Sequence, residues 1–324
     1  MVNEFKLFAG SANEPLAKKI ATCLGTEVSK CTLKRFSDGE IFFQINENIR
    51  GMDVFILQST NPPAENLMEL FIMIDACRRA SARRITAVIP YYGYARQDRK
   101  DQPRVAITAK LVANLITTAG VDRVMLMDLH ASQIQGFFDC PSDHLYSSKV
   151  FNGHIRRLNL RPAVAVTPDV GSIKLVRAFA KDLDFSIAII DKRRPDINKA
   201  EVMNIIGEID GKNVVIRDDM VDTAGTLCEA AVVLKEKGAR KIIAACTHAV
   251  FSGQAIEKIN NSPIEKVFVA DTIYNPPEKL SPKIEVLSVS NLFADAIVRV
   301  HEEKSLSSLF EASDSDFGRV PKNI

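Results

Sequence analysis

The sequence predicts an α/β fold with mostly parallel sheets flanked by helices. Short apolar runs of strand length alternate along the chain with longer segments of helical periodicity. The strand-like runs lie at 54–58, 85–90, 124–127, 164–167, 187–190, 214–216, 242–245 and 267–269. The helical patterns lie at 66–80, 108–119, 172–181 and 227–237. Such alternation is typical of parallel strands joined by crossover helices.

A faint duplication indicates that the chain contains two similar halves. In both 120–131 and 238–249, a glycine that ends a helix is followed by basic residues, a strand and then His-Ala. Ten positions separate the glycine from the histidine in each segment. With this alignment, 91–99 in the first half takes the place of the turn 222–226 in the second.

The duplication predicts two domains with the same α/β architecture, one at 1–146 and one at 147–311. A length of 324 residues agrees with about two domains. The remaining segment, 312–324, is polar and without periodicity, so we expect a disordered tail.

The composition indicates which kinds of ligand or surface the protein binds. The formal net charge of +2 argues against a general nucleic-acid surface, and local basic clusters suit small polyanionic ligands better. No apolar run reaches membrane-spanning length, and the N-terminus enters a strand-like segment without a signal-peptide pattern. The six cysteines lack metal or redox spacing. We therefore expect a cytoplasmic protein with reduced thiols that binds neither nucleic acid nor membrane.

The segment 214–226 carries the clearest functional motif. An apolar strand at 214–216 leads to adjacent carboxylates, Asp218 and Asp219, and then to a small-residue turn at 222–226 that opens a helix. Ligands of parallel sheets bind outside the carboxyl ends of strands, and helix N-termini favour anions. The acid pair repels phosphate but suits sugar hydroxyls or a nearby Mg²⁺. The motif therefore predicts a phosphorylated sugar, with an ordinary acidic helix cap as the alternative.

Two segments of the first half carry groups suited to a nucleotide. The segment 35–40 contains Asp-Gly, a strong hairpin signal. Besides forming that hairpin, Phe36 could stack on a purine while neighbouring carboxylates accept from its amine. The segment 90–99 follows a strand directly, and its Arg96 and Arg99 can grip phosphates. The alternative for this second segment is a solvated basic loop.

Three further positions follow strand ends. His130 can ligate a metal or bond to phosphate, although a structural histidine is the alternative. Asp169 is a candidate Mg²⁺ ligand, through water. The segment 191–195 places three cations on a loop that ends at proline, either a mobile positive arm or a solvated turn.

Taken together, these segments resemble the ribose-phosphate pyrophosphokinase family from residue 6 to about residue 309. Matching motifs lie at 35–40, 44–50, 66–70, 94–99, 107–110, 128–130, 135–138, 191–195, 218–226 and 251–253. The resemblance implies two phosphoribosyltransferase-like domains, Mg²⁺, and a homo-oligomer, commonly a hexamer. It also implies transfer of a diphosphoryl group from MgATP to the 1-hydroxyl of ribose 5-phosphate, with AMP as the leaving group.

The resemblance assigns roles motif by motif. It implies that ATP is held by Phe36, Asp38, Gly39, Glu40, Arg96, Gln97 and Arg99. His130 and Asp169 would lie at the metal, and Lys192 and Arg194 would be catalytic. Ribose 5-phosphate would be held by Asp218, Asp219, Asp222, Thr223, Ala224, Gly225 and Thr226.

Three positions depart from the family pattern and keep other interpretations open. Arg217 stands where the family usually has Val or Ile, Ser172 replaces a glycine, and Leu175 replaces an arginine. A non-catalytic regulatory subunit or a weakened paralogue is therefore the alternative to a pyrophosphokinase. A phosphoribosyltransferase that consumes the product is a third interpretation, but its base-binding hood is not visible in the sequence.

Overall fold

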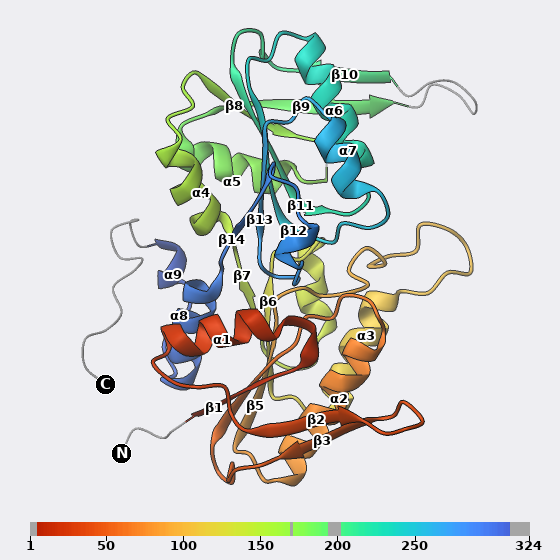
Figure 1. Ribbon diagram of the computed structural model, residues 1–324, viewed down its shortest axis with the longest axis vertical. Helices are drawn as coiled ribbons and strands as arrows, with labels where there is room; N and C mark the ends of the chain where they lie inside the picture. The colour runs from red at the N-terminus through yellow and green to blue at the C-terminus, as the bar shows by residue number, and fades with distance from the viewer. Residues whose placement is uncertain (1–4, 169–170, 194–201, 312–324) are drawn as a thin grey trace. The chain divides into compact units, whose positions relative to one another are not determined.

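A computed structural model of the chain describes residues 5–168, 171–193 and 202–311 (Figure 1). The described chain divides into two compact units. The first unit contains the chain up to Tyr146, the short segment Thr272–Tyr274 and the chain from Ser288 onward. The second unit contains Ser147–Asp271 and Asn275–Leu287. No helix in the described ranges is both long and apolar enough to cross a membrane.

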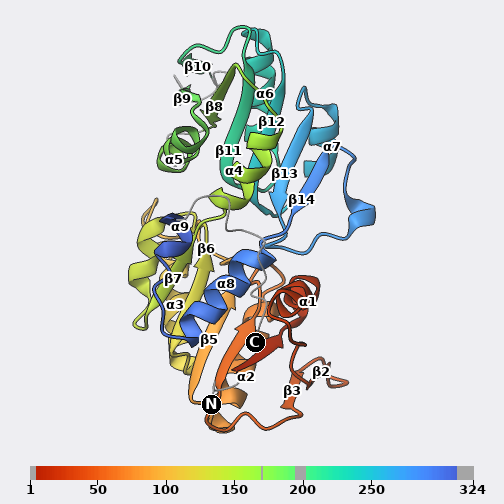
Figure 2. The ribbon, with the colours of Figure 1, turned by 90° about the vertical axis from the view of Figure 1, so that its left-hand side faces the viewer.

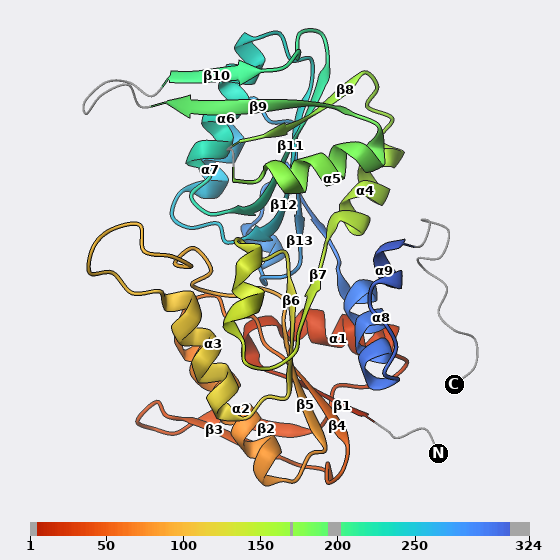
Figure 3. The same cartoon turned by 180° about the vertical axis from the view of Figure 1, so that it is seen from behind.

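The first unit is built on a five-stranded parallel sheet with the order β1-β4-β5-β6-β7. Its strands are β1 (Phe5–Ala9), β4 (Asp53–Leu57), β5 (Arg84–Ile89), β6 (Arg123–Met127) and β7 (Ser142–Leu145). Its helices are α1 (Glu14–Cys23), α2 (Glu65–Arg79), α3 (Thr108–Ala119), α8 (Ser290–His301) and α9 (Ser308–Glu311). Short 3-10 segments lie at Ser11–Asn13 and Ser132–Phe137. Helices α2 and α3 cover one face of this sheet and α1 and α8 the other (Figure 2, Figure 3).

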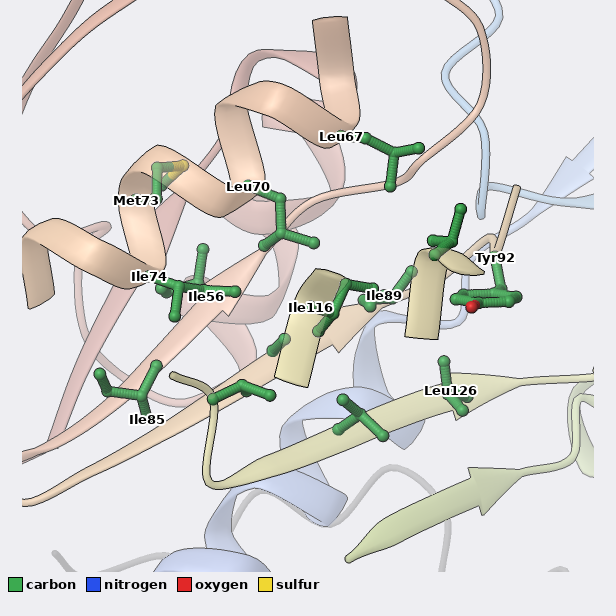
Figure 4. Close-up of a cluster of buried hydrophobic side chains, with 14 of the residues drawn as sticks. Ile56, Leu67, Leu70, Met73, Ile74, Ile85, Ile89, Tyr92, Ile116 and Leu126 are labelled. Carbon is green, nitrogen blue, oxygen red and sulfur yellow. The ribbon is translucent and has the colours of Figure 1, made fainter. Parts of the chain in front are cut away.

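Alternate strand residues build the core of the first unit. Ile56, Ile85 and Leu126 point to one face and pack against Leu70 and Ile116 of the covering helices (Figure 4). Because side chains alternate along a strand, the residues between them face the other helices. Both faces are therefore buried, which explains why these strands read as continuous apolar runs.

The predicted hairpin is confirmed. Strands β2 (Cys31–Arg35) and β3 (Ile41–Ile45) pair antiparallel as a separate two-stranded sheet. At the tip, the N–H of Phe36 donates to the carbonyl of Glu40 at 2.9 Å, and Gly39 adopts a φ of +95°, which suits glycine.

The second unit contains a seven-stranded sheet with the order β10-β9-β8-β11-β12-β13-β14. The strands are β8 (Ala163–Thr167), β9 (Ser186–Arg193), β10 (Val202–Ile206), β11 (Asn213–Val221), β12 (Ile242–Ala249), β13 (Lys266–Ala270) and β14 (Ile284–Leu287). All pairings are parallel except that of β9 with β10. The helices are α4 (Ser148–Arg157), α5 (Ile173–Leu183), α6 (Gly225–Glu236) and α7 (Ala255–Asn261), with a 3-10 turn at Pro277–Lys279. Helices α6 and α7 pack on one face of the sheet, and α5 packs on the other (Figure 1).

The two sheets share an order, but not in the alignment that the sequence suggested. By position in the sheet and along the chain, β1, β4, β5, β6 and β7 correspond to β8, β11, β12, β13 and β14. The predicted alignment of 120–131 with 238–249 pairs β6 with β12 and is wrong by one strand. The counterpart of the turn after β11 is therefore the segment that begins at Ser59, after β4, and not 91–99.

Two predicted strands are longer than their apolar runs. Strand β11 continues to Val221, so Asp218 and Asp219 lie inside it and not after it. Strand β9 continues to Arg193, and Lys192 pairs with Met203 of β10. The prediction that 191–195 is a loop is therefore wrong for its first three residues. Antiparallel pairing with β10 keeps these polar residues extended.

The end of the chain returns to the first unit. Helix α8 packs on α1, so the segment from Ser288 to residue 311 groups with the first unit, whereas the sequence assigned it to the second domain. A buried carboxylate, Asp53, anchors this helix: it accepts from His301 Nδ1 at 2.8 Å and from Arg84 Nη2 at 2.6 Å. Arg84 also donates to the carbonyl of Val300 at 2.9 Å. The predicted disordered tail, 312–324, lies outside the described residues.

Asp53 supports a prediction about stability and pH. Burial on its own raises the pKa of Asp53, but bonds from His301 and Arg83 and the charge and bond of Arg84 hold it below its ordinary value. A carboxyl group whose pKa is lower in the folded protein than in the unfolded chain stabilises the fold at pH values above its unfolded pKa. This stabilisation is lost as the pH falls through the folded pKa. We expect Asp53→Asn to lower the free energy of unfolding by about 2–3 kcal/mol at pH 7, measured by urea denaturation.

The difference between the wild type and Asp53→Asn should shrink below about pH 4, where the unfolded carboxylate begins to bind protons. Asp75→Asn is the matched control, because Asp75 pairs with Arg79 on an exposed helix surface and should contribute at most about 0.5 kcal/mol. A loss for Asp53→Asn that is the same at every pH would contradict this assignment.

Candidate active site

The turn that follows β11 is held in place by the segment that follows the neighbouring strand, β12. The N–H groups of Val250 and Phe251 donate to the carbonyl of Val221 at 2.9 and 3.1 Å. The N–H of Ser252 donates to the carbonyl of Asp222 at 3.0 Å. Because β11 lies between β8 and β12 inside the sheet, the turn emerges at the carboxyl edge where ligands bind.

The turn presents backbone amides at the start of α6. Ala224 precedes the helix with a φ of +58°, a left-handed conformation that is uncommon for a residue other than glycine. The bond from Cys228 N–H to the Ala224 carbonyl opens the helix, so the amides of 225–227 have no acceptor within it. Amides in this position and the positive end of a helix dipole favour an anion.

The rest of the turn leaves room for a ligand. Thr223 and Thr226 are exposed, and a Cβ added to Gly225 would meet only Thr223 Oγ1, at 3.8 Å. The alternative of an acidic side-chain cap is not observed at the N-cap, because Ala224 occupies that position. The structure thus places the predicted phosphate turn, 222–226, directly before the first turn of α6, and phosphate binding there stays a prediction.

The two acids differ in their surroundings. Asp218 is half-buried, and its Oδ1 accepts from the hydroxyl of Ser172 and from the N–H of Asp219, both at 2.9 Å. Asp219 is buried, with 9% of its surface exposed. Ser172 therefore contacts Asp218, one of the two predicted sugar ligands. The sequence itself marks Ser172 only as a replacement for glycine.

Arg217 is fully buried beside the acids. Its guanidinium donates to carbonyl or hydroxyl oxygens of Asp218, Ala245, Ser147 and Thr247. It also lies over the ring of Phe151, 4.7 Å from the centroid. The bonds to Ser147 and Thr247 were not expected, because no local pattern links residues 70 and 30 positions away.

The first unit brings two of the predicted segments together. Strands β5 and β6 are neighbours, so the loop after Ile89 and the segment after Met127 emerge at the same edge of the sheet. Gln133, just beyond His130, donates to Asp98 Oδ2 at 2.6 Å and links the two segments.

The loop after β5 presents the predicted nucleotide-binding side chains to solvent. Arg96, Gln97 and Arg99 of this loop are exposed, and so is His130, the predicted metal ligand that follows β6. The carbonyl of Gln97 accepts from Ala109 N–H at 3.1 Å, which fixes the loop to the start of α3.

The hairpin residues are not brought to that loop. Phe36, 48% exposed, packs edge-on against Phe42, and Asp38 Oδ1 accepts from Glu40 N–H at 3.0 Å. The β2–β3 hairpin packs on α2, and its tip lies apart from the loop that precedes α3 (Figure 1, Figure 3). Within one chain, therefore, Phe36, Asp38, Gly39 and Glu40 do not join Arg96, Gln97 and Arg99.

The predicted catalytic and metal residues are only partly described. The backbone of Lys192 lies in β9, whereas Arg194 and Asp169 fall outside the described residues. In the described ranges, no group of three His, Cys, Asp or Glu side chains could hold a metal by itself. Mg²⁺ usually takes only one or two carboxylates and completes its shell with water and phosphates, so any site here would depend on the substrates.

The second unit is an α/β sheet whose acid-bearing strand, β11, runs into a small-residue turn at the start of a helix, at the edge where such proteins bind their ligands. Residues 5–120 match the N-terminal domain of ribose phosphate pyrophosphokinase, and residues 192–311 match the phosphoribosyl synthetase-associated domain. A ribose-phosphate pyrophosphokinase from Chlorobaculum tepidum is 57% identical over 315 residues, 97% of each chain. Another from Thermotoga maritima is 54% identical over 95% of this chain and 98% of that one.

A solved structure agrees with these relatives. The crystal structure of phosphoribosylpyrophosphate synthetase from Mycobacterium smegmatis superposes with a TM-score of 0.88 at 40% identity, covering 93% of this chain and 99% of that one. The chain belongs to the ribose-phosphate pyrophosphokinase family. The predicted family and fold class are thereby confirmed.

Proposed function

We propose that the protein transfers the diphosphoryl group of MgATP to the 1-hydroxyl of ribose 5-phosphate, giving phosphoribosyl pyrophosphate and AMP for nucleotide biosynthesis. The observation that carries this proposal is the anion-binding turn at the end of an acid-bearing strand, in a chain 57% identical to a ribose-phosphate pyrophosphokinase. Because the relatives reported above are named as pyrophosphokinases or synthetases, an enzyme is favoured over a regulatory subunit.

The second unit would bind the sugar phosphate. The 5-phosphate would accept hydrogen bonds from the amides of 223–226, with the side chains of Thr223 and Thr226 beside it. The carboxylates of Asp218 and Asp219 would accept from the ribose hydroxyls. The carboxylates would thus hold the hydroxyl end of the sugar and the turn amides its phosphate end. This would orient the 1-hydroxyl for attack on the β-phosphorus of ATP.

The chemistry needs positioning and charge cancellation more than covalent catalysis. As the bond to AMP breaks, negative charge develops on the departing oxygen of AMP, and Lys192 and Arg194 would cancel negative charge around the reacting phosphates. Mg²⁺ supplies further neutralisation of the phosphates when bound. His130 and Asp169 would lie at the metal and phosphates, as the resemblance implies.

The first unit would bind ATP. Arg96 and Arg99 would hold phosphates through planar guanidinium groups. Phe36 would stack on the adenine, with Asp38 and Glu40 as acceptors for its amine. Since the hairpin and the loop lie apart within one chain, we propose that a second copy supplies the hairpin, in a homo-oligomer that the family resemblance gives as a hexamer. All six cysteines are free thiols, which supports a cytoplasmic location.

The direct test is to incubate purified protein with ATP, Mg²⁺ and ribose 5-phosphate and to separate the nucleotides by chromatography. AMP should form only when ribose 5-phosphate is present, in amounts equal to the phosphoribosyl pyrophosphate produced. AMP at background level under these conditions would favour the regulatory subunit. ADP in place of AMP would mean that a single phosphoryl group is transferred, and would reject the proposed reaction.

Complementation tests the shared nucleotide site. We expect Phe36→Ala and Arg96→Ala each to lower AMP formation at least about tenfold, because each removes a ligand contact. Co-expression of the two variants should restore part of the activity, since some sites then combine an intact hairpin with an intact loop. Co-expression of Phe36→Ala with Asp38→Ala is the control, because both changes lie on the hairpin and no intact one remains. Equal activity in the two mixtures would reject the shared site.

A further inference from the structure

We propose that Arg217 and Ser172 are positioning residues that hold Asp218 in place for ribose 5-phosphate, one through the main chain and the other through the side chain. This inference rests on the proposed function, because it takes Asp218 as a sugar ligand. Both residues donate a hydrogen bond to the same aspartate.

Arg217 holds the main chain of Asp218. Its Nη1 donates to the Asp218 carbonyl and, at 3.1 Å, to the Ala245 carbonyl of the neighbouring β12. Its Nη2 donates to Thr247 Oγ1 of β12 at 3.0 Å and to Ser147 Oγ at 3.1 Å, and these two hydroxyls are 2.9 Å apart. The guanidinium therefore ties the acid-bearing strand to β12 and to the residue before α4.

A packing role alone does not account for this residue. A buried guanidinium carries a large desolvation penalty, and an apolar side chain of similar volume is often as stable or more so. Arg217 is 0% exposed, and one of its hydrogen bonds goes to the main-chain carbonyl of Asp218, the first of the two acids. The buried guanidinium therefore lies where it can restrain the part of β11 that carries Asp218.

Ser172 holds the side chain of Asp218. It occupies the N-cap of α5, where a serine hydroxyl ordinarily accepts from an amide of its own helix. Here the hydroxyl makes no capping bond and instead donates to Asp218 Oδ1 at 2.9 Å. The same oxygen accepts from the Asp219 N–H, so the Asp218 carboxylate is oriented from two directions.

The consequence is an acid that is ordered before the ligand arrives. Fixing a ligand group in advance lowers the entropy lost on binding. The restraint acts on the sugar site of the second unit and not on the nucleotide segments of the first. Loss of either residue should therefore weaken ribose 5-phosphate binding and leave the KM for ATP nearly unchanged.

The test compares Arg217→Met, Ser172→Ala and the double variant with Val214→Ala. Val214 is buried near the other end of β11, so Val214→Ala disturbs the same strand without touching Asp218. We expect Arg217→Met to raise the Kd and KM for ribose 5-phosphate about tenfold and Ser172→Ala about threefold, with the KM for ATP within about twofold. The double variant should lose less than the product of the two effects, because both act on one carboxylate. Calorimetry with ribose 5-phosphate and steady-state AMP formation give these values.

Several results would overturn the inference. If Arg217→Met and Val214→Ala lower the melting temperature alike and leave the Kd for ribose 5-phosphate unchanged, Arg217 serves stability alone. A parallel rise in KM for both substrates would also reject it. If Arg217→Met does not fold, Ser172→Ala still decides, since its hydroxyl lies at the start of a surface helix. A wild-type protein that forms no AMP would reject the proposed function, whereas an active wild type with unaffected variants rejects only this inference.

Discussion

Replacing Thr226 with glutamate is expected to weaken ribose 5-phosphate binding by about 10²–10³-fold while leaving the free protein at least as stable as the wild type. Thr226 is exposed in the first turn of α6, where a carboxylate interacts favourably with the helix dipole. The same carboxylate would face the 5-phosphate. Two unit charges about 4 Å apart interact by roughly 4 kcal/mol near a protein surface, which corresponds to an increase of about 10²–10³-fold in Kd. Calorimetry with ribose 5-phosphate and a thermal melt measure the two effects.

Thr226→Gln is the matched control, because glutamine has nearly the shape of glutamate without its charge. It should bind ribose 5-phosphate within about tenfold of the wild type, the cost of one neutral hydrogen bond. Similar losses in the two variants would point to a steric effect. Unchanged binding in Thr226→Glu would mean that the phosphate lies elsewhere.

Replacing Lys192 with alanine is expected to lower turnover by about 10²–10³-fold, the range for losing one preorganised donor to developing charge. The Kd values for ATP and ribose 5-phosphate should change much less, because the interaction strengthens only as negative charge develops in the transition state. Rapid-quench measurement of AMP in a single turnover separates this step from product release.

Lys181→Ala, which removes an exposed lysine from the last turn of α5, is the control for a general loss of positive charge. It should leave turnover within about twofold of the wild type, as for surface changes away from a site. Near-wild-type turnover in Lys192→Ala would remove Lys192 from the mechanism.

The central strands of both sheets could be located from the sequence because they are buried on both faces. The pattern failed where strands continue into polar residues. Asp218 and Lys192 stay extended because neighbouring strands pair with them, and such pairing is decided by contacts far along the chain. The shifted alignment of the halves has the same origin, since one buried apolar strand resembles the next.

The phosphate turn could be predicted because its chemistry is local: small residues lead directly into a helix. The environment of Arg217 could not be predicted from the sequence, because its hydrogen-bond partners include Ser147, 70 positions away. Sequence reasoning identified Arg217 and Ser172 as unusual, but only the structure brings both to Asp218. The separation of the β2–β3 hairpin from the loop that precedes α3 likewise depends on how the hairpin packs on α2.

The return of α8 to the first unit affects how the protein is made. Domains tend to fold as they leave the ribosome, in order of synthesis. Here His301, which completes the bonds around Asp53, is translated after the whole of the second unit. The second unit can therefore complete its folding on the ribosome before the first unit does. Until α8 is synthesised, the face of the five-stranded sheet that α8 covers stays exposed. Stalled translation or a premature stop codon near residue 288 should thus yield an aggregation-prone fragment and not a folded half-enzyme.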